Sequence, residues 1–302
     1  MEQIAQEIKE SQVRDVRSNE PLSRHTTWRV GGPADILIYP RTKGELERTM
    51  AVIRKHGIPW RVIGKGSNLL VRDGGIRGAV IKMGNGLDEW RIDKDRVTAG
   101  GGLSFVKLSV LVSRQGLTGL EFAGGIPGTV GGAVFMNAGA HGSELSHVLE
   151  SAEVLLETGQ WAVFSNQELQ FSYRTSILQR EKRGVVTEAT FRLQEGDREQ
   201  VLSAMAKLKD YRRQTQPLQY PCAGSVFRNP SGDHSGRLIE AAGLKGYRVG
   251  DAEVSTQHAN FIINRGNATA NDVLTLIEHI IGTIEDKYGV TLVPEVQVVG
   301  EG

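Results

Sequence analysis

The sequence predicts a mixed fold, with an α+β part up to about residue 210 and a smaller α/β part after it. One reason is that residues 34–63 have a strand–helix–strand pattern, for which parallel strand pairing is expected. A second is that short strand patterns recur up to residue 193. The third is a change of composition near Gln214, where residues 216–221 resemble a linker or the start of a domain.

The individual elements follow from apolar periodicity and from capping residues. Residues 1–23 indicate a polar helix and a turn. Thr42 opens the next helix, with Glu45 in the capping-box position, and Gly57 ends it. The predicted strands are residues 34–39, 60–63, 78–83, 151–157, 161–165, 184–193 and 291–299, with a hairpin over residues 90–98. The other predicted helices are residues 104–115, residues 198–213 with Val201, Met205 and Leu208 inward, and a helix that a capping box at Thr269 and Asp272 opens.

Composition narrows the class of protein. The chain of 302 residues has 36 Lys plus Arg against 35 Asp plus Glu, so no global field attracts nucleic acid or an anionic membrane. The single cysteine, Cys222, excludes an intrachain disulfide and a paired-cysteine zinc site. The best apolar stretch, residues 273–284, is too short to span a bilayer, and residues 1–10 lack a signal-peptide core. A cytoplasmic protein with no metal, nucleic-acid or membrane partner is expected, and a monomer is assumed.

The first glycine segment, residues 64–69 (GKGSNL), follows a predicted strand directly. It begins like a dinucleotide fingerprint, but Leu69 stands where a third glycine belongs, and the residues after it are strand-like. The Rossmann interpretation therefore fails. Exposed backbone N–H groups with Ser67 and Asn68 could still hold a pyrophosphate. The alternative is a tight turn that Ser67 and Asn68 stabilise.

The second glycine segment, residues 124–140, is longer. Seven glycines fall within residues 124–142, and such a run is costly in chain entropy. Backbone without side chains lets a flat or extended ligand approach closely. The alternative is a glycine-packed helix contact. Two such segments in one chain favour a ligand site.

Several motifs, in this order, resemble those of one family, the UDP-N-acetylenolpyruvoylglucosamine reductases (MurB). The resemblance extends from Thr26 to Gly300. Its motifs are GKGSNL at 64–69, GIPGTVGGA at 125–133, NAGA at 137–140, YRTS at 173–176, AGSVFRNP at 223–230, VS at 254–255 with HANF at 258–261, and PEV at 294–296.

The resemblance implies an FAD-binding fold of the vanillyl-alcohol-oxidase (PCMH) type. Residues 1–85 and 86–210 would be its two FAD-binding subdomains, and residues 211–302 a substrate-binding domain. It also implies that NADPH reduces a non-covalently bound FAD. The reduced flavin then reduces UDP-N-acetylglucosamine enolpyruvate to UDP-N-acetylmuramate, a peptidoglycan precursor that links the enzyme to cell wall, cell shape and cell division.

The chemistry requires two kinds of side chain. Hydride addition to the enol ether develops negative charge toward the adjacent carboxylate, and the neighbouring carbon must receive a proton. By resemblance, Arg174 stabilises the charge, Ser225 donates the proton and Glu295 assists. Without the resemblance, the three would be interpreted as a surface arginine, a serine in a turn and a glutamate on a strand face.

The resemblance also implies the binding residues. Those expected at the cofactor are Gly64, Lys65, Gly66, Ser67, Asn68, Leu69, Gly125, Ile126, Pro127, Gly128, Thr129, Gly132, Ala133, Asn137, Gly139 and Ala140. Those expected at the substrate are Tyr173, Arg213, Gln216 and Asn229. His258 is interpreted as a structural histidine, and Cys222 as an inert thiol.

One departure and two alternatives remain open. Longer members of the family carry an inserted loop whose tyrosine folds over the substrate, and this chain resembles the shorter subclass without it. Another FAD-dependent oxidase or dehydrogenase of the same fold is the first alternative. The second is a catalytically silent nucleotide-binding or UDP-sugar-binding protein, which the presence of Arg174, Ser225 and Glu295 disfavours.

Overall fold

The computed structural model describes residues 1–302, which form two compact units. Unit 1 comprises residues 1–18, 36–64 and 78–211, and unit 2 comprises residues 19–35, 65–77 and 212–302. Unit 1 contains two clusters of buried apolar side chains and unit 2 contains a third. The division into residues 1–85, 86–210 and 211–302 stays a prediction.

A four-stranded sheet has the order β1-β2-β5-β3. Its strands are β1 (Val16–Pro21), β2 (Pro33–Ile38), β3 (Trp60–Ile63) and β5 (Ile76–Lys82). The parallel neighbour of β3 is β5, which therefore separates β3 from β2. Strand β1 lies where the sequence predicted only a helix and a turn.

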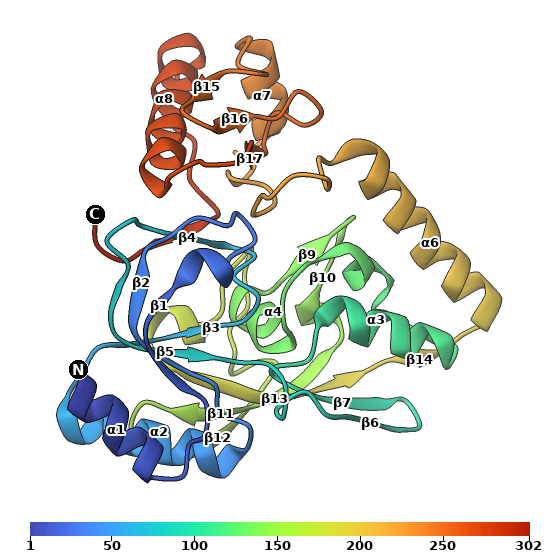
Figure 1. The fold of residues 1–302 in the computed structure, drawn as a ribbon. Coiled ribbons are helices and arrows are strands. Elements are labelled where there is room, and N and C mark those ends of the chain that lie inside the picture. Colours follow the sequence, from blue (N-terminus) through green and yellow to red (C-terminus); the bar gives the residue numbers. More distant parts are fainter. The chain divides into compact units, whose positions relative to one another are not determined.

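Two N-terminal helices accompany this sheet, α1 (Glu2–Glu10) and α2 (Lys43–His56), and they pack against each other (Figure 1). Thr42 Oγ1 accepts a hydrogen bond from Glu45 N at 3.1 Å, as predicted. The capping box is incomplete, because the Glu45 carboxylate accepts from Arg41 N at 2.8 Å. Gly57 ends α2 with φ +59°, the left-handed conformation that suits glycine.

The second sheet of unit 1 is antiparallel, with the order β12-β11-β13-β7-β6. Its strands are β6 (Trp90–Asp93), β7 (Arg96–Gly100), β11 (Leu149–Leu156), β12 (Trp161–Ser165) and β13 (Gly184–Arg192). The helices α3 (Phe105–Arg114) and α4 (Val130–Met136) lie over one face of it, and α4 contacts β7 and β13 (Figure 1). The strands predicted over residues 151–157, 161–165 and 184–193 and the hairpin over residues 90–98 are confirmed.

Shorter elements complete unit 1. They are β8 (Leu117–Thr118), η2 (Glu121–Gly125), β9 (Gly139–Ala140), β10 (Ser143–Glu144), η3 (Leu145–His147), α5 (Ile177–Arg180) and β14 (Gln194–Glu195). The long helix α6 (Arg198–Thr215) begins in unit 1, where Val201 is buried while Met205 and Leu208 are half-buried. The predicted inward face of α6 is therefore correct, although it is shallow.

Unit 2 is built around α8 (Ala270–Tyr288), which packs on β15 (Arg248–Val249) and β16 (Ala252–Val254). Its other elements are η1 (Leu22–Arg24), β4 (Leu69–Val71), α7 (Ser235–Ala241), β17 (Ile262–Asn264) and β18 (Gln297–Val299). The capping box at Thr269 and Asp272 is present. No helix is long and apolar enough to cross a membrane.

The predicted strand over residues 291–299 is wrong in extent. Only β18 (Gln297–Val299) is a strand, and it pairs in parallel with β4, with Gln297 opposite Leu69. A continuous strand would place the side chains of Val296 and Val298 on the same face. A bend at Val296 interrupts this alternation of faces, and Val296 is buried whereas Val298 is 39% exposed. Glu295 therefore lies in the irregular segment before β18, where a side chain need not follow the strand pleat.

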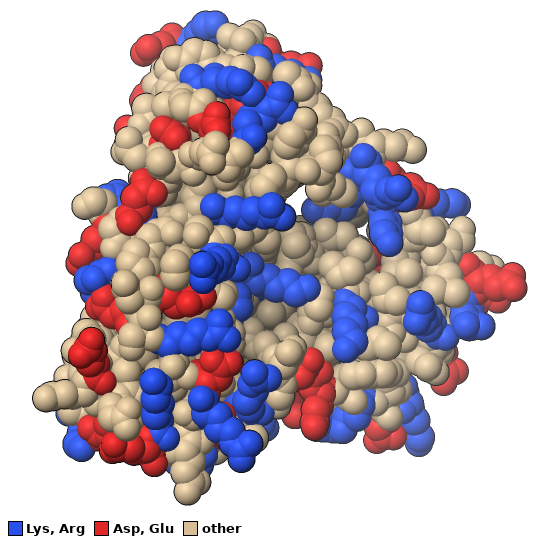
Figure 2. Space-filling model, in the orientation of Figure 1, with Lys and Arg blue, Asp and Glu red and all other residues tan.

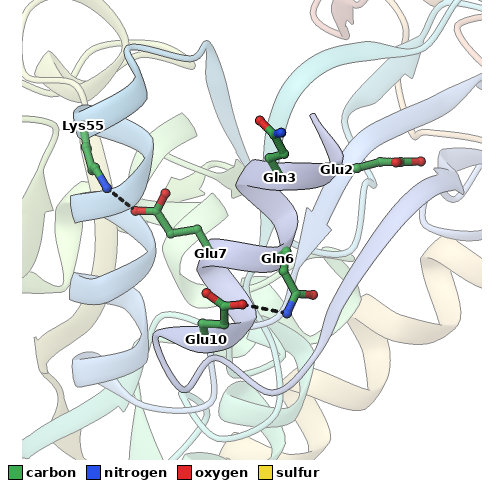
Figure 3. Close-up of a pocket in the computed structure, with 6 residues that line it drawn as sticks. All are labelled: Glu2, Gln3, Gln6, Glu7, Glu10 and Lys55. Carbon is green, nitrogen blue, oxygen red and sulfur yellow. Dashed lines mark hydrogen bonds and ion pairs between the residues drawn. The ribbon is translucent and has the colours of Figure 1, made fainter.

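The surface has mixed charge (Figure 2) and a pocket at α1 and α2 that contains none of the predicted site residues. Acidic and basic side chains are interspersed over much of the visible face (Figure 2). One surface pocket is lined by Glu2, Gln3, Gln6, Glu7 and Glu10 of α1 and Lys55 of α2 (Figure 3). The Glu7 carboxylate pairs there with Lys55 Nζ and His56 Nε2, each at 2.7 Å, which joins the two helices. No predicted site residue lines this pocket.

Candidate active site

The first glycine segment is tightly packed at both of its glycines. A Cβ on Gly64 would lie 2.5 Å from Thr129 Oγ1, so Gly64 directly contacts the second glycine segment. Gly66 has φ +66°, and a Cβ there would lie 2.3 Å from the His25 carbonyl oxygen. Any side chain at either position would clash, which explains why both are glycine.

The glycines of the second segment serve two purposes. A Cβ on Gly131 would lie 3.1 Å from the Gly101 carbonyl oxygen, and one on Gly124 would lie 2.9 Å from Met205. Gly131 therefore lets α4 approach the backbone after β7, and Gly124 lets η2 approach α6, so only the second contact is the glycine-packed helix contact of the alternative interpretation. Gly128 differs, because its φ of +140° requires glycine in the loop before α4.

Both glycine segments offer hydrogen-bond donors to a ligand. The backbone N–H groups of Gly66, Asn68, Gly128 and Thr129 donate to no acceptor within the protein. Burial lowers the pKa of Lys65, which is the charged residue of the first segment. Amide donors suit the phosphates of a dinucleotide cofactor, and the first segment adds an ammonium group, so the residues of each segment, taken by itself, fit FAD.

Arg174 lies at a tight turn next to the second glycine segment. Ser172 and Thr175 exchange backbone hydrogen bonds of 3.1 and 3.0 Å, with Tyr173 and Arg174 between them. Arg174 has φ +57°, and its Nη2 donates to the Gly139 carbonyl at 2.8 Å. Its guanidinium also lies over the Tyr173 ring, 4.9 Å from the centroid.

Ser225 and Glu295 lie together in unit 2. Glu295 N donates to the Val226 carbonyl at 2.7 Å, and Arg228 N donates to the Val293 carbonyl at 2.9 Å. The hydroxyl of Ser225 makes no hydrogen bond within the protein. Two of the three predicted catalytic residues are therefore neighbours, although the sequence separates them widely.

The first glycine segment joins this pair. Asn68 Nδ2 donates to the Glu295 carbonyl at 3.3 Å, and Gln297 N donates to the Asn68 carbonyl at 3.0 Å. The pairing of β4 with β18 continues the contact beyond the segment. A residue predicted to bind the cofactor, Asn68, and a residue predicted to act on the substrate, Glu295, thus belong to one hydrogen-bond network.

The residues predicted to bind the substrate are placed variously. Asn229 is exposed, and its Oδ1 accepts from Ser235 N at 3.1 Å at the start of α7. Gln216 Oε1 accepts from Arg212 Nε at 3.0 Å, so part of its amide is already engaged. Arg213 is exposed at the end of α6, and Tyr173 is 48% exposed.

Two further residues from the sequence have structural surroundings. His258 Nδ1 accepts a hydrogen bond from Asn260 N at 3.2 Å, and its ring lies 4.8 Å from that of Phe261. Burial, then the charge of Lys245, lowers the pKa of His258, so the neutral form is favoured. These contacts agree with a structural histidine at a turn.

Cys222 is expected to react slowly. Burial raises the pKa of its thiol, an effect that the Gly224 backbone and the charge of Arg212 oppose only in part. Because the thiolate is the reactive form, an aromatic disulfide reagent at pH 7.5 should label folded protein far more slowly than urea-unfolded protein. Equal labelling rates would contradict the expected protection of this half-buried thiol.

Sequence comparisons agree with the motifs. Residues 34–165 match a family described as FAD binding domain, and residues 216–299 match UDP-N-acetylenolpyruvoylglucosamine reductase, C-terminal domain. The UDP-N-acetylenolpyruvoylglucosamine reductase of Anoxybacillus flavithermus is 54% identical over 300 residues, which cover 99% of each chain. The chain belongs to the UDP-N-acetylenolpyruvoylglucosamine reductase family. The reductase of Bacillus subtilis is 51% identical over the same share of both chains.

Solved structures extend this result to the fold of the reductase family. The reductase from Thermus caldophilus, 38% identical, superposes with a TM-score of 0.81 over 94% of this chain and 98% of that one. Berberine bridge enzyme from Eschscholzia californica, at 14% identity, has a TM-score of 0.51 over 65% of this chain and 44% of its own. The FAD-binding fold with an additional C-terminal domain is therefore confirmed.

Two residues that support the site were not assigned a role from the sequence. Asn260 is buried, and its side chain bonds to both backbone groups of Phe227, close to Ser225. Glu144 accepts from Asn137 Nδ2 at 2.9 Å, near Arg174. Capping residues can be recognised from their spacing, whereas Asn260 bonds to a segment 33 positions away and Glu144 bonds across a hairpin that the sequence did not predict.

Proposed function

We propose that this chain uses FAD and NADPH to reduce UDP-N-acetylglucosamine enolpyruvate to UDP-N-acetylmuramate. The observation that carries the proposal is the hydrogen-bond network of Asn68, Val226 and Glu295, because it joins the first glycine segment to the Ser225 neighbourhood. The relatives from Anoxybacillus flavithermus and Bacillus subtilis are UDP-N-acetylenolpyruvoylglucosamine reductases, which supports the same reaction. The product would serve peptidoglycan synthesis, in the cytoplasm, with its consequences for cell shape and division.

The cofactor would be held by backbone groups more than by side chains. In the first glycine segment, the free amides of Gly66 and Asn68 with the Lys65 ammonium would bind a phosphate of FAD, and in the second segment the free amides of Gly128 and Thr129 would bind FAD. When bound, FAD would supply the redox step by taking a hydride from NADPH and giving it to the enolpyruvyl double bond.

The protein's own residues would manage charge and protons. The Arg174 guanidinium can bind the substrate carboxylate through two parallel hydrogen bonds and so stabilise charge that develops during hydride addition. The Ser225 hydroxyl, which has no protein partner, can give its proton to the neighbouring carbon. Glu295, whose backbone is fixed to Val226, would orient or resupply that proton.

The substrate's remaining groups would contact the residues named from the family resemblance. Tyr173, Arg213, Gln216 and Asn229 offer a phenol, a guanidinium and two amides, which suit a sugar and a diphosphate. The proposal includes a monomeric protein with a small-molecule substrate and no nucleic-acid partner.

The two half-reactions can be tested separately under anaerobic conditions. We expect the purified protein with FAD to lose its oxidised flavin absorbance when NADPH is added. Addition of UDP-N-acetylglucosamine enolpyruvate should then restore that absorbance rapidly. Reduction without reoxidation would reject this substrate and favour a related FAD-dependent oxidoreductase, and a protein that binds no FAD would reject a flavoenzyme altogether.

A further inference from the structure

The turn that carries Arg174 holds an unfavourable backbone conformation. Arg174 has φ +57°, in the left-handed region that costs a residue with a side chain roughly 1 kcal/mol or more. Such a conformation persists only where the surroundings impose it. The contacts of this turn therefore decide where the guanidinium points.

Asn137 is the residue that ties the turn to the second glycine segment. Its side chain is 0% exposed, and its Nδ2 donates to the Ser172 carbonyl at 3.1 Å and to Glu144 Oε1 at 2.9 Å. Its Oδ1 accepts from Ser146 N at 3.0 Å. Both amide hydrogens and the amide oxygen have partners within the protein, so the Asn137 side chain is committed to this network rather than to a ligand.

Glu144 fixes the orientation of that amide. Its Oε1 accepts from Asn137 Nδ2 and also from Ser146 Oγ at 2.6 Å. A reversed Asn137 amide would place its oxygen against this carboxylate and against the Ser172 carbonyl, which is repulsive. Glu144 thus selects the one orientation in which Asn137 holds the turn.

The β9–β10 hairpin places Glu144 beside Gly139, whose carbonyl bonds to the Arg174 side chain. Glu144 pairs with Gly139, and the Gly139 carbonyl accepts the Arg174 Nη2 hydrogen bond. A Cβ on Gly139 would lie 2.7 Å from the Glu144 Cβ, so the glycine permits this approach. Burial raises the pKa of Glu144, but the hydrogen bonds from Ser146 and Asn137 and the charges of His147 and Arg174 outweigh it and lower the pKa overall. Glu144 is therefore ionised at neutral pH, with Arg174 in its field.

We propose that Glu144 is a positioning residue, which acts through Asn137 and Gly139 to hold the Arg174 guanidinium in the orientation that receives the substrate carboxylate. The inference rests on the proposed function, because it assigns Arg174 to that carboxylate. It adds a second role for the second glycine segment, which supports a substrate group as well as the cofactor.

The test is a double-mutant cycle read by single-turnover reoxidation of FAD-loaded, NADPH-reduced protein. Glu144→Ala should slow reoxidation by the enolpyruvyl substrate by about 10- to 100-fold, the effect expected of a misplaced group. Flavin content and the rate of reduction by NADPH should stay unchanged. Glu144→Gln, which keeps an acceptor oxygen for Asn137, should recover most of the rate, and Glu181→Ala, an exposed control in the same unit, should have no effect.

The Arg174→Ala background separates the two hypotheses. If Glu144 acts through Arg174, Glu144→Ala should cause no further loss in that background. An equal loss in both backgrounds, or a lower Tm with an unchanged reoxidation rate, would overturn the positioning role while the proposed function stands. If Arg174→Ala itself reoxidises at the normal rate, the role of Arg174 in the proposed function fails, and the positioning role fails with it.

Discussion

Ser225→Ala is expected to slow the reduction of the enolpyruvyl substrate by about 10²- to 10⁴-fold, the usual contribution of a positioned proton donor. The substitution removes only the hydroxyl, which makes no hydrogen bond within the protein. The fold and the cofactor site should therefore be unaffected. The expected result is a yellow protein that NADPH reduces at the normal rate but that the substrate reoxidises slowly.

Two controls make this result specific. Ser231→Ala changes an exposed serine directly after residues 223–230, the motif that contains Ser225, and it should leave both half-reactions unchanged. Solvent deuterium should slow reoxidation in the unmodified enzyme if proton transfer limits the rate. A Ser225→Ala protein that reoxidises at the unmodified rate would remove Ser225 from the mechanism, whatever the role of Arg174.

Local sequence signals predicted much of the fold. The bounds of β3 and β12 agree with the predicted residues 60–63 and 161–165, because alternating apolar residues between turn residues decide such strands locally. Thr42, Gly57 and Thr269 mark helix ends as predicted, since capping depends on residues only a few positions apart.

The pairing of strands that lie far apart in the sequence was not predicted. Strand β4 has three residues and is paired with β18, which follows it by more than two hundred positions. The residues of β4 were recognised as strand-like, but its pairing with β18 exists only after the chain has folded. For the same reason the strand predicted over residues 291–299 was too long, and the bend at Val296 was missed.

The candidate site shows the same division. The glycines of the first segment were recognisable because they cluster directly after a predicted strand, and the structure explains them, since any side chain at Gly64 or Gly66 would clash. The catalytic roles of Arg174, Ser225 and Glu295 came from the family resemblance and stay predictions. Glu144 and Asn260 could not be found from one sequence, because each is a common polar residue whose meaning lies in its partners.

Asn260→Ala is expected to destabilise the fold by about 2–5 kcal/mol, since it leaves two buried backbone groups without partners. Asn260 Oδ1 accepts from Phe227 N, and its Nδ2 donates to the Phe227 carbonyl, each at 2.9 Å. Its backbone carbonyl also accepts from Val226 N at 2.9 Å. Asn260 thus bonds to the backbone of Val226 and Phe227, next to Ser225, much as a neighbouring strand would. Residues 293–295 bond to the backbone of Val226 and Arg228.

The measurement is thermal and urea unfolding of the variant beside Asn267→Ala, an exposed asparagine whose loss should change stability by no more than about 0.5 kcal/mol. Asn260→Ala should lower Tm by roughly 5–15 °C. Below that transition, reoxidation by the substrate should also be slower, because a segment held on one edge leaves the Ser225 hydroxyl less well placed. Normal stability would show that water forms the hydrogen bonds that the Phe227 backbone N–H and carbonyl lose. A lower Tm with an unchanged reoxidation rate would show that the contacts to residues 293–295 are enough to place Ser225.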